Sequence, residues 1–399
     1  MEYIQTQKDT VFLLERDPLR AKAGYRVTHE GQLTAEESVG WLDTKSMPYP
    51  GNSAHIHAIV QAGCARAVNM RHPAAKRLLE QPWDIPQRKQ RVHILAMGDV
   101  GATLLTGLVL LGDDVISSIG IFDVREDILR RYEFEMNQIS WPFEYDQLPT
   151  VDAITQSELF NCDVFVFCAS GAIPPVDSGL PDVRMAQLAG NTKILKTYAR
   201  QARDAGFEGI FAVVSDPVDL LCQFAYLESN RNEEQILDWH GLLAEQIRGY
   251  GLGVMNARAA YYAKREERFA SFLTQGRAYG PHGKGLVIAN SINEYDEVLS
   301  LELTKLTLEA NLRMRETGFK PYIAPALSSG AMSLLLTMRR QWHYSAVFLD
   351  GVFFGCKNRQ SELGVEIEAQ DLPQQLYARI CSAHDLLWEQ GGQWRFSKG

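Results

Sequence analysis

The sequence lacks any excess of positive charge: 40 lysine and arginine residues stand against 49 aspartate and glutamate residues, a formal net charge of -9. Such a chain has no basic field to hold a nucleic acid backbone or an anionic membrane surface. It also lacks a long apolar run, since the longest, VGATLLTGLVLLG, is short and rich in glycine. The first residues, MEYIQTQKDTVFLLERD, have no cationic stretch leading into an apolar one, so we expect no signal peptide.

Cysteine pairs with metal-binding spacing are absent too. The six cysteines are scattered without a CxxC pair, which favours free thiols in a reducing cytoplasm over disulfides or a zinc site. The pair His55-x-His57 is a second candidate for a metal. On a helix its two rings would point to different faces, and two more ligands would be needed, so we expect no metal site.

What is present is an ordinary globular composition, with 46% hydrophobic and 22% charged residues in a chain of 399. The first ninety residues show little periodicity, although AHIHAIVQAGCARAVNM is consistent with one amphipathic helix. From residue 91 the pattern changes. RVHILAMGDVGATLLTGLVLLGDDVISSIGIFDV predicts a strand, a glycine turn, a helix and a second strand, and CDVFVFCAS and GIFAVVS predict further buried strands.

Strands that alternate with helices in this way predict an α/β fold of the Rossmann type, with a doubly wound parallel sheet. After residue 254 the pattern indicates an α+β domain. Its strands include antiparallel hairpins in AVFLDGVFFGCKNRQSELGVEIEAQ, and an amphipathic helix ends the chain. We therefore expect three parts: an N-terminal extension over 1–90, a dinucleotide-binding domain over 91–254 and a substrate domain over 255–399.

The turn Gly98-Asp99-Val100-Gly101 follows a strand and opens a helix, and Asp123 ends the next strand. In a dinucleotide-binding fingerprint the glycines let the backbone approach the pyrophosphate. The helix N-terminus attracts it, and the distal carboxylate binds the ribose hydroxyls. A purely structural tight turn would account for the glycines equally well.

Two residues of this segment depart from the fingerprint. Ala96 replaces its first glycine, and Asp99 puts a carboxylate where the pyrophosphate would lie. Asp123 favours NAD over NADP because a carboxylate repels a 2′-phosphate, while Arg125 keeps NADP open.

Taken in order, six segments resemble the lactate/malate dehydrogenase family over residues 91–390. They are ILAMGDVGATLL, IFDV, VVSDPVDLL, IRGYGLGVMNAR, GPHGKGLVIANS and FLDGVFFGCKNRQSELGVEIE. The resemblance implies an NAD-dependent oxidoreductase that moves a hydride between nicotinamide and a 2-hydroxy or 2-keto acid. It also implies a homodimer or homotetramer. Residues 1–90 have no counterpart in a typical member.

The resemblance also implies roles for single residues. His282, in the GPHG turn, takes the place of the general acid/base, and Arg258 that of the two-donor fork for the substrate carboxylate. Arg184, on a mobile loop, would polarise the carbonyl. Asn191 would contact the cofactor and Ser328 the substrate, although a helix-surface serine is almost as good an interpretation of Ser328.

Three departures from the family pattern bear on activity. The aspartate that normally orients the histidine is Met255, and a thioether is at best a weak acceptor. The asparagine beside the substrate is Asp216, which would either repel a substrate carboxylate or replace the missing partner of His282. The specificity position is Ile173, whose apolar side chain argues against a dicarboxylate such as malate. Two hypotheses follow: a divergent dehydrogenase that uses Asp216, or a binding or regulatory protein that kept the fold and lost the chemistry.

Overall fold

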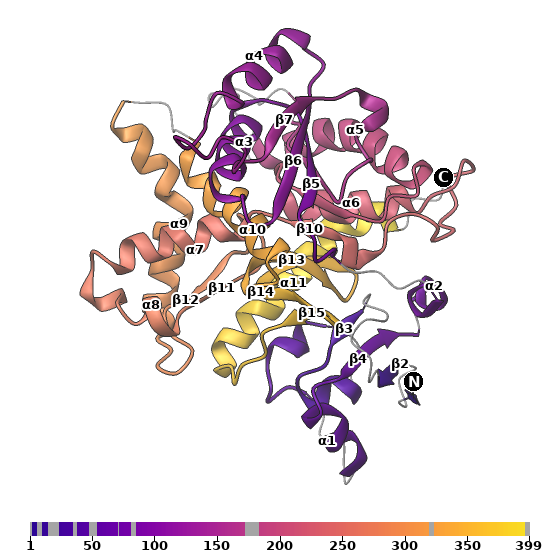
Figure 1. Ribbon diagram of the computed structural model, residues 1–399. Helices are drawn as coiled ribbons and strands as arrows, with labels where there is room; N and C mark the ends of the chain where they lie inside the picture. Colours follow the sequence, from indigo (N-terminus) through magenta and orange to yellow (C-terminus); the bar gives the residue numbers. More distant parts are fainter. Residues whose placement is uncertain are drawn as a thin grey trace.

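The computed structural model describes most of the chain, namely residues 2–5, 10–14, 24–34, 38–47, 54–70, 72–80, 85–171, 183–318 and 323–395. In this part, one sheet of 13 strands runs through the molecule in the order β1-β2-β4-β3-β15-β14-β13-β10-β9-β8-β5-β6-β7 (Figure 1). None of the helices described has the length and apolar character that crossing a bilayer requires.

One half of the sheet is parallel and doubly wound. Its strands are β5 (Gln90–Leu95), β6 (Ile116–Phe122), β7 (Thr150–Ala153), β8 (Val164–Phe167), β9 (Ile210–Val213) and β10 (Ile247–Gly249). Their spatial order, β7-β6-β5-β8-β9-β10, is the 3-2-1-4-5-6 order of a dinucleotide-binding fold. The linking helices are α3 (Asp99–Leu111), α4 (Glu126–Met136), α5 (Val183–Asp204) and α6 (Val218–Ser229). The predicted Rossmann-type α/β class is confirmed.

The central strands β8 (VFVF) and β9 (IFAV) are apolar throughout because helices cover both faces of the sheet. Along β8, the side chains of Val164 and Val166 belong to the cluster that packs under α3, whereas Phe165 and Phe167 belong to the cluster under α5 and α6. Successive side chains of a strand point to opposite faces, so a buried run of this kind needs a helix layer on each side. Figure 1 shows α3 and α5 on opposite sides of β5 and β6.

The C-terminal half continues the sheet with antiparallel strands. β10 pairs with β13 (His343–Leu349), which forms hairpins through β14 (Val352–Ser361) to β15 (Gly364–Ile367). A separate ribbon joins β11 (Arg277–Tyr279) to β12 (Val287–Ala289). The helices are α7 (Leu252–Ala263), α8 (Phe272–Gln275), α9 (Glu297–Glu316), α10 (Ala331–Met338) and α11 (Gln374–Arg395). The predicted hairpins and final helix are confirmed.

The N-terminal region extends the same sheet. β3 (Tyr25–Arg26) pairs with β15, and beyond it lie β4 (Ala65–Asn69), β2 (Thr10–Leu14) and β1 (Glu2–Gln5). Its helices are α1 (Ala54–Gln61) and α2 (Ala75–Glu80), with 3-10 turns η1 (Glu30–Thr34) and η2 (Val39–Leu42). The domain boundaries near residues 90 and 254 stay a prediction.

The expectation of one helix over AHIHAIVQAGCARAVNM is wrong. Helix α1 ends at Gln61, Gly63 turns the chain at a φ of +68°, and Ala65 begins β4. Glycine adopts this left-handed backbone without steric cost, and β4 gains two neighbouring strands. Tertiary pairing therefore overrides the helical pattern of the second half of the segment.

Large aromatic side chains fix the N-terminal region to the C-terminal strands. Trp41 is fully buried, and its ring packs edge-on against that of Tyr25 at 5.4 Å between centroids. The Tyr25 hydroxyl donates a hydrogen bond to the carbonyl of Phe348 on β13. Both rings lie in one apolar cluster with residues of β13 to β15 and α11, so the region shares its core with the C-terminal half.

His72 also ties the N-terminal region to α6, through its Nε2 atom 2.5 Å from the Tyr226 hydroxyl. Burial lowers the pKa of His72 from 6.5 to about 4. Between these two pH values the His72 ring is protonated in the unfolded chain but not in the folded chain. The free energy of unfolding therefore falls as pH falls from 6.5 toward 4. We expect this group to remove up to about 3 kcal/mol of unfolding free energy over that range. Urea unfolding at pH 7 and pH 4.5 measures the difference in unfolding free energy between the two pH values. In His72→Gln this difference should be smaller than in the wild type. The same difference in the variant and the wild type would contradict the prediction.

Candidate active site

Four of the predicted segments meet at one edge of the parallel sheet. Gly98 follows β5, Asp123 follows β6, Asp216 follows β9 and Gly251 follows β10. The carboxyl ends of parallel strands point the same way, and ligands of doubly wound sheets bind outside them. The chain order of strands thus brings together residues that are far apart in the sequence.

The glycine turn has the geometry that close backbone approach requires. A Cβ on Gly101 would lie 2.0 Å from the carbonyl oxygen of Ala96, so only glycine fits there. A Cβ on Gly98 would meet no atom within 4 Å, so space is open beside the first turn of α3. Ala96 has a φ of +74°, the conformation for which glycine is the usual residue. A helix N-terminus with open space beside a glycine suits a pyrophosphate.

Asp123 is held at the end of β6 by two backbone groups. Its Oδ2 accepts a hydrogen bond from the N–H of Met97 at 2.8 Å, and its Oδ1 accepts from that of Arg125 at 3.0 Å. Each carboxylate oxygen keeps a further lone pair for a ribose hydroxyl. The Arg125 guanidinium pairs with Asp127 at 2.9 Å. The turn and this carboxylate together fit the adenosine and pyrophosphate parts of NAD.

Two glycine substitutions separate the structural role of the turn from its binding role. Gly101→Ala should lower the unfolding free energy by about 2–3 kcal/mol, because its Cβ would be forced against backbone. Gly98→Ala should unfold like the wild type but bind NADH roughly tenfold more weakly, since its methyl group enters the open space. Thermal unfolding and NADH fluorescence titration measure both. Unchanged NADH affinity in Gly98→Ala would mean that the turn is purely structural.

His282 lies in the turn between β11 and β12, where Gly280 and Gly285 have φ values of +84° and +93°. Its Nδ1 is 3.1 Å from Oδ1 of Asp216, and its backbone N–H donates to Oδ2 of buried Asp219 at 3.2 Å. Its Nε2 is buried and has no hydrogen-bond partner within the described chain. The histidine is therefore fixed by a tight turn and two carboxylates, and its second ring nitrogen is enclosed without a partner among the described residues.

Met255, which stands where the family has aspartate, is fully buried on α7. Its sulfur accepts a weak contact from Nη1 of Arg258 at 3.7 Å, and Nη2 of Arg258 donates to Oδ1 of Asn311 on α9. In this arrangement the carboxylate beside the His282 ring comes from the β9 side, at Asp216, rather than from α7.

Asn191, predicted to contact the cofactor, uses its amide to fix the chain. The side chain is buried on α5; its Oδ1 accepts from the N–H of Gly171 at 2.7 Å, and its Nδ2 donates to the carbonyl of Asp216 at 2.6 Å. It therefore holds the backbone of Asp216 in place. Neither this contact nor that of Asp219 could be predicted from the sequence, because each joins segments distant in the chain.

Asp216 and His282 line a cavity of about 200 Å³ at this edge. Arg258, Val100 and Asn311 line it too, as does Ser329; the predicted neighbour Ser328 is not among its lining residues. Ser329 donates to the carbonyl of Gly251 and accepts from the N–H of Val254. Ile173 lies outside the described residues. Arg184 lies in the first turn of α5, and its side chain is also outside the described part.

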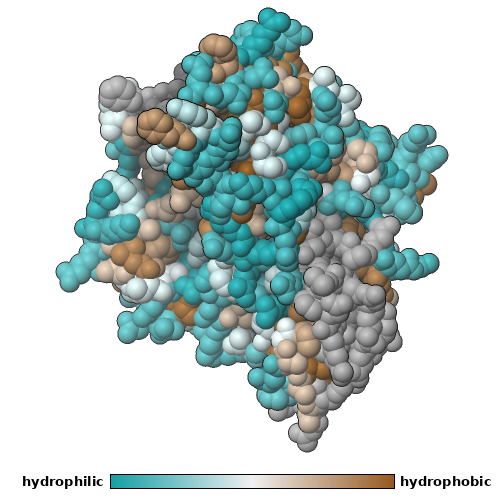
Figure 2. Space-filling view, in the orientation of Figure 1, coloured by the Kyte–Doolittle hydropathy of each residue, from teal (hydrophilic) through white to brown (hydrophobic). Residues whose placement is uncertain are grey.

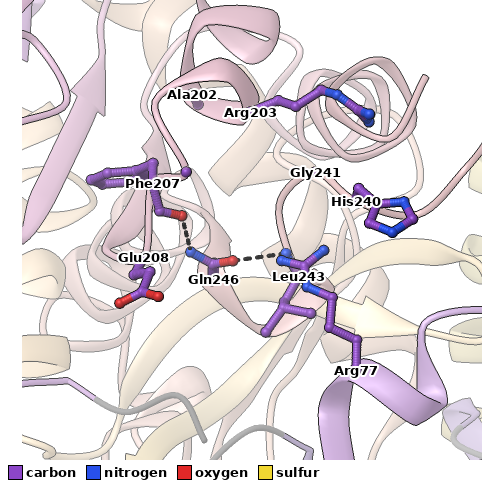
Figure 3. Close-up of a pocket in the computed structure, with 10 residues that line it drawn as sticks. Arg77, Ala202, Arg203, Phe207, Glu208, His240, Gly241, Leu243 and Gln246 are labelled. Carbon is purple, nitrogen blue, oxygen red and sulfur yellow. Dashed lines mark hydrogen bonds between the residues drawn. The ribbon is translucent and has the colours of Figure 1, made fainter. Parts of the chain in front are cut away.

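A second cavity, of about 240 Å³, lies near the opposite, amino end of β9 (Figure 3). Gln246 spans it by donating to the carbonyl of Phe207 at 2.9 Å. Its arginines are already engaged: Arg203 forms a two-point pair with Asp238 at 2.6–2.7 Å, and Arg77 donates to a backbone carbonyl. These contacts hold α2 and α5 together and leave little charge for a ligand.

No cluster of three or more metal-ligating side chains occurs among the residues described. His57 is exposed and contacts Glu30, while the side chain of His55 lies outside the described part.

Known proteins resemble this chain in sequence and in fold. Residues 90–238 match the family described as lactate/malate dehydrogenase, NAD binding domain. A malate dehydrogenase from Sulfurimonas denitrificans is 26% identical over 279 residues, covering 66% of this chain and 81% of the relative. An L-lactate dehydrogenase from Staphylococcus epidermidis is 25% identical over 195 residues, covering 49% of this chain and 55% of the relative, so the chain spans about half of that enzyme.

Two solved structures share the fold. One is a lactate dehydrogenase from a Medee basin deep-sea metagenome library, with a TM-score of 0.61, 17% identity, and coverage of 78% of this chain and 100% of that one. The other is the minor L-lactate dehydrogenase from Enterococcus mundtii, with a TM-score of 0.61, 18% identity, and coverage of 78% and 99%.

Proposed function

We propose that the chain is an NAD-dependent member of the lactate/malate dehydrogenase family that transfers a hydride between nicotinamide and a 2-hydroxy or 2-keto acid. The observation that carries the proposal is the His282–Asp216 pair at 3.1 Å, with the other ring nitrogen buried and unpartnered in the described structure. Arg258 lines the same cavity. An acid/base group and a carboxylate-binding fork thus lie together at the cofactor edge of the sheet.

The pair provides what proton transfer needs. With Nδ1–H donating to the Asp216 carboxylate, the Nε2 lone pair accepts the proton of a substrate hydroxyl, and the negative charge of Asp216 stabilises the resulting imidazolium. In reduction the same atom returns the proton to the carbonyl oxygen. Bound NAD supplies the hydride acceptor or donor. The Asn191 amide keeps the Asp216 backbone in place, and we propose that Arg184 polarises the carbonyl.

Arg258 would hold the substrate carboxylate, and Arg258→Lys tests that role. Lysine offers a point charge in place of a planar two-donor fork, so we expect KM to rise about ten- to a hundredfold with a smaller fall in kcat. Steady-state kinetics on a panel of 2-keto acids measures the change. Unchanged constants would mean that Arg258 does not contact the substrate.

The proposed substrate is not malate. The lining of the cavity includes Val254, Ile323 and Pro325, whose side chains offer no partner for a second carboxylate. Ile173, as the proposed specificity residue, has the same apolar character. Steady-state kinetics with pyruvate and with oxaloacetate test this substrate preference. Faster reduction of oxaloacetate than of pyruvate would contradict the exclusion of malate.

The buried Met255 keeps one alternative open, a binding or regulatory protein that retains the fold without turnover. NADH binding with no oxidation on any 2-keto acid would favour it. We also propose that the protein is cytoplasmic and forms a homodimer or homotetramer. Light scattering would test the oligomeric state, and a monomer would contradict the proposal.

A further inference from the structure

A third and larger cavity adjoins the one that contains His282. It lies between α7 and α9 and has a volume of about 620 Å³. Tyr261 and Tyr262 of α7 form one wall, and Ala310 and Met314 of α9 form part of the other. We refer to this cavity as the α7–α9 groove. In Figure 2, hydrophobic residues are visible among hydrophilic ones on the left of the molecule, over α7, α8 and α9.

The α7–α9 groove is continuous with the candidate active site. Val254, Arg258, Asn311 and Pro325 line both cavities. The smaller cavity, of about 200 Å³, is below the range of about 300–1,000 Å³ that is usual for larger ligands, whereas the groove is within it. A ligand that reacts at His282 therefore has room to extend past Arg258.

The chemistry of the walls limits what can bind there. Apart from the tyrosines, Ala257 and Val254 add apolar surface, and the only charged side chains among the described lining residues are Arg258 and Arg313. The Arg313 guanidinium lies 5.4 Å from the ring centroid of Tyr262. The two arginines, together with the aromatic rings, suit an anion with an apolar or aromatic body.

We propose that the α7–α9 groove binds the aromatic or large apolar side chain of the 2-keto acid that the active site reduces. The proposal rests on the proposed function and names the substrate class of that site. The carboxylate and the side chain leave the same carbonyl carbon. An acid with its carbonyl at His282 and its carboxylate on Arg258 thus has its side chain at the junction with the groove, where Val254 and Pro325 lead to the tyrosines. Pyruvate, with a methyl group, leaves the groove empty.

Calorimetry on the full chain loaded with NAD⁺, which has no hydride to give to a 2-keto acid, tests this with pyruvate and phenylpyruvate as probes. We expect phenylpyruvate to bind about ten- to a hundredfold more tightly, the gain from burying one aromatic ring. In Ala310→Trp, which fills the groove, the ratio of the two affinities should fall toward one. Met314→Trp is a second variant that fills the groove. Its side chain is 41% exposed, so the larger residue should not prevent folding. Leu312→Trp, on the same helix but outside the groove lining, is the matched control and should keep the ratio.

Equal affinities in the wild type, or a preference that survives both fillings, would overturn the groove assignment, and so would failure to bind either acid. Turnover distinguishes this result from failure of the proposed function. Reduction of pyruvate with no preference for phenylpyruvate would overturn the groove alone. A groove-dependent preference in binding without NADH oxidation would support the groove and overturn the redox function.

Discussion

Replacing Asp216 by asparagine should lower the rate of 2-keto acid reduction by about four orders of magnitude, the cost of losing the orienting carboxylate in a serine-protease triad. Asparagine is the usual residue of the family at this position, so simple restoration of the family pattern would predict a faster enzyme. Here the Asp216 carboxylate, at 3.1 Å, is the group beside Nδ1 of His282. An amide there offers no charge to stabilise the imidazolium, and its NH₂ can favour the wrong tautomer.

The double variant Asp216→Asn with Met255→Asp should recover part of the loss, because it returns a carboxylate to the family's position on α7. Asp385→Asn is a matched control: this carboxylate is 3.9 Å from a ring nitrogen of His384, is 77% exposed, and belongs to α11 rather than to the site. Its activity should equal that of the wild type. Stopped-flow and steady-state NADH oxidation measure all three variants. A rate in Asp216→Asn at or above the wild type would eliminate the compensating carboxylate.

Trp41→Ala should lower the free energy of unfolding by about 3–5 kcal/mol, the usual cost of emptying a large aromatic site in a core. The ring is fully buried between the N-terminal region and the C-terminal strands. Its indole N–H has no hydrogen-bond partner within the described residues, so the loss is one of packing. Urea unfolding measures the change.

Trp141→Ala provides the control for this experiment, since Trp141 is 55% exposed near the far edge of the sheet. Its change should stay within about 0.5 kcal/mol. A loss below about 1 kcal/mol in Trp41→Ala would mean that residues 1–90 fold separately from the rest of the chain, against the shared core described above.

The Rossmann half could be predicted from the sequence because its signals are local. Apolar runs such as VFVF need no partner to indicate a doubly covered strand, and the turn at Gly98 and Gly101 lies between a strand and a helix that are contiguous in sequence. The N-terminal strands could not be predicted in this way. The β4 strand, ARAVN, is short and follows a helix after the turn at Gly63, and only its pairing with β2 and β3 makes it a strand.

In the candidate site, too, local motifs could be predicted from the sequence and contacts between distant segments could not. Spacing within a motif placed His282 and Arg258, and the structure brings both to one cavity. Contacts between distant segments could not be predicted from the sequence. The Asn191 amide forms a hydrogen bond with the backbone carbonyl of Asp216. Ser329 lines the cavity, whereas the predicted residue Ser328 does not. One-residue differences of this kind depend on the rotation of a helix turn, which the sequence pattern does not fix.

The measurement that tests the central claim most directly is transfer of deuterium from NADH carrying it at C4 of the nicotinamide. With pyruvate or phenylpyruvate as acceptor and the wild-type chain as catalyst, mass spectrometry and NMR of the product should find the deuterium on C2 of the 2-hydroxy acid. The transfer should disappear in Asp216→Asn. Bound NADH with no deuterium in any hydroxy acid product would contradict hydride transfer at the His282–Asp216 site.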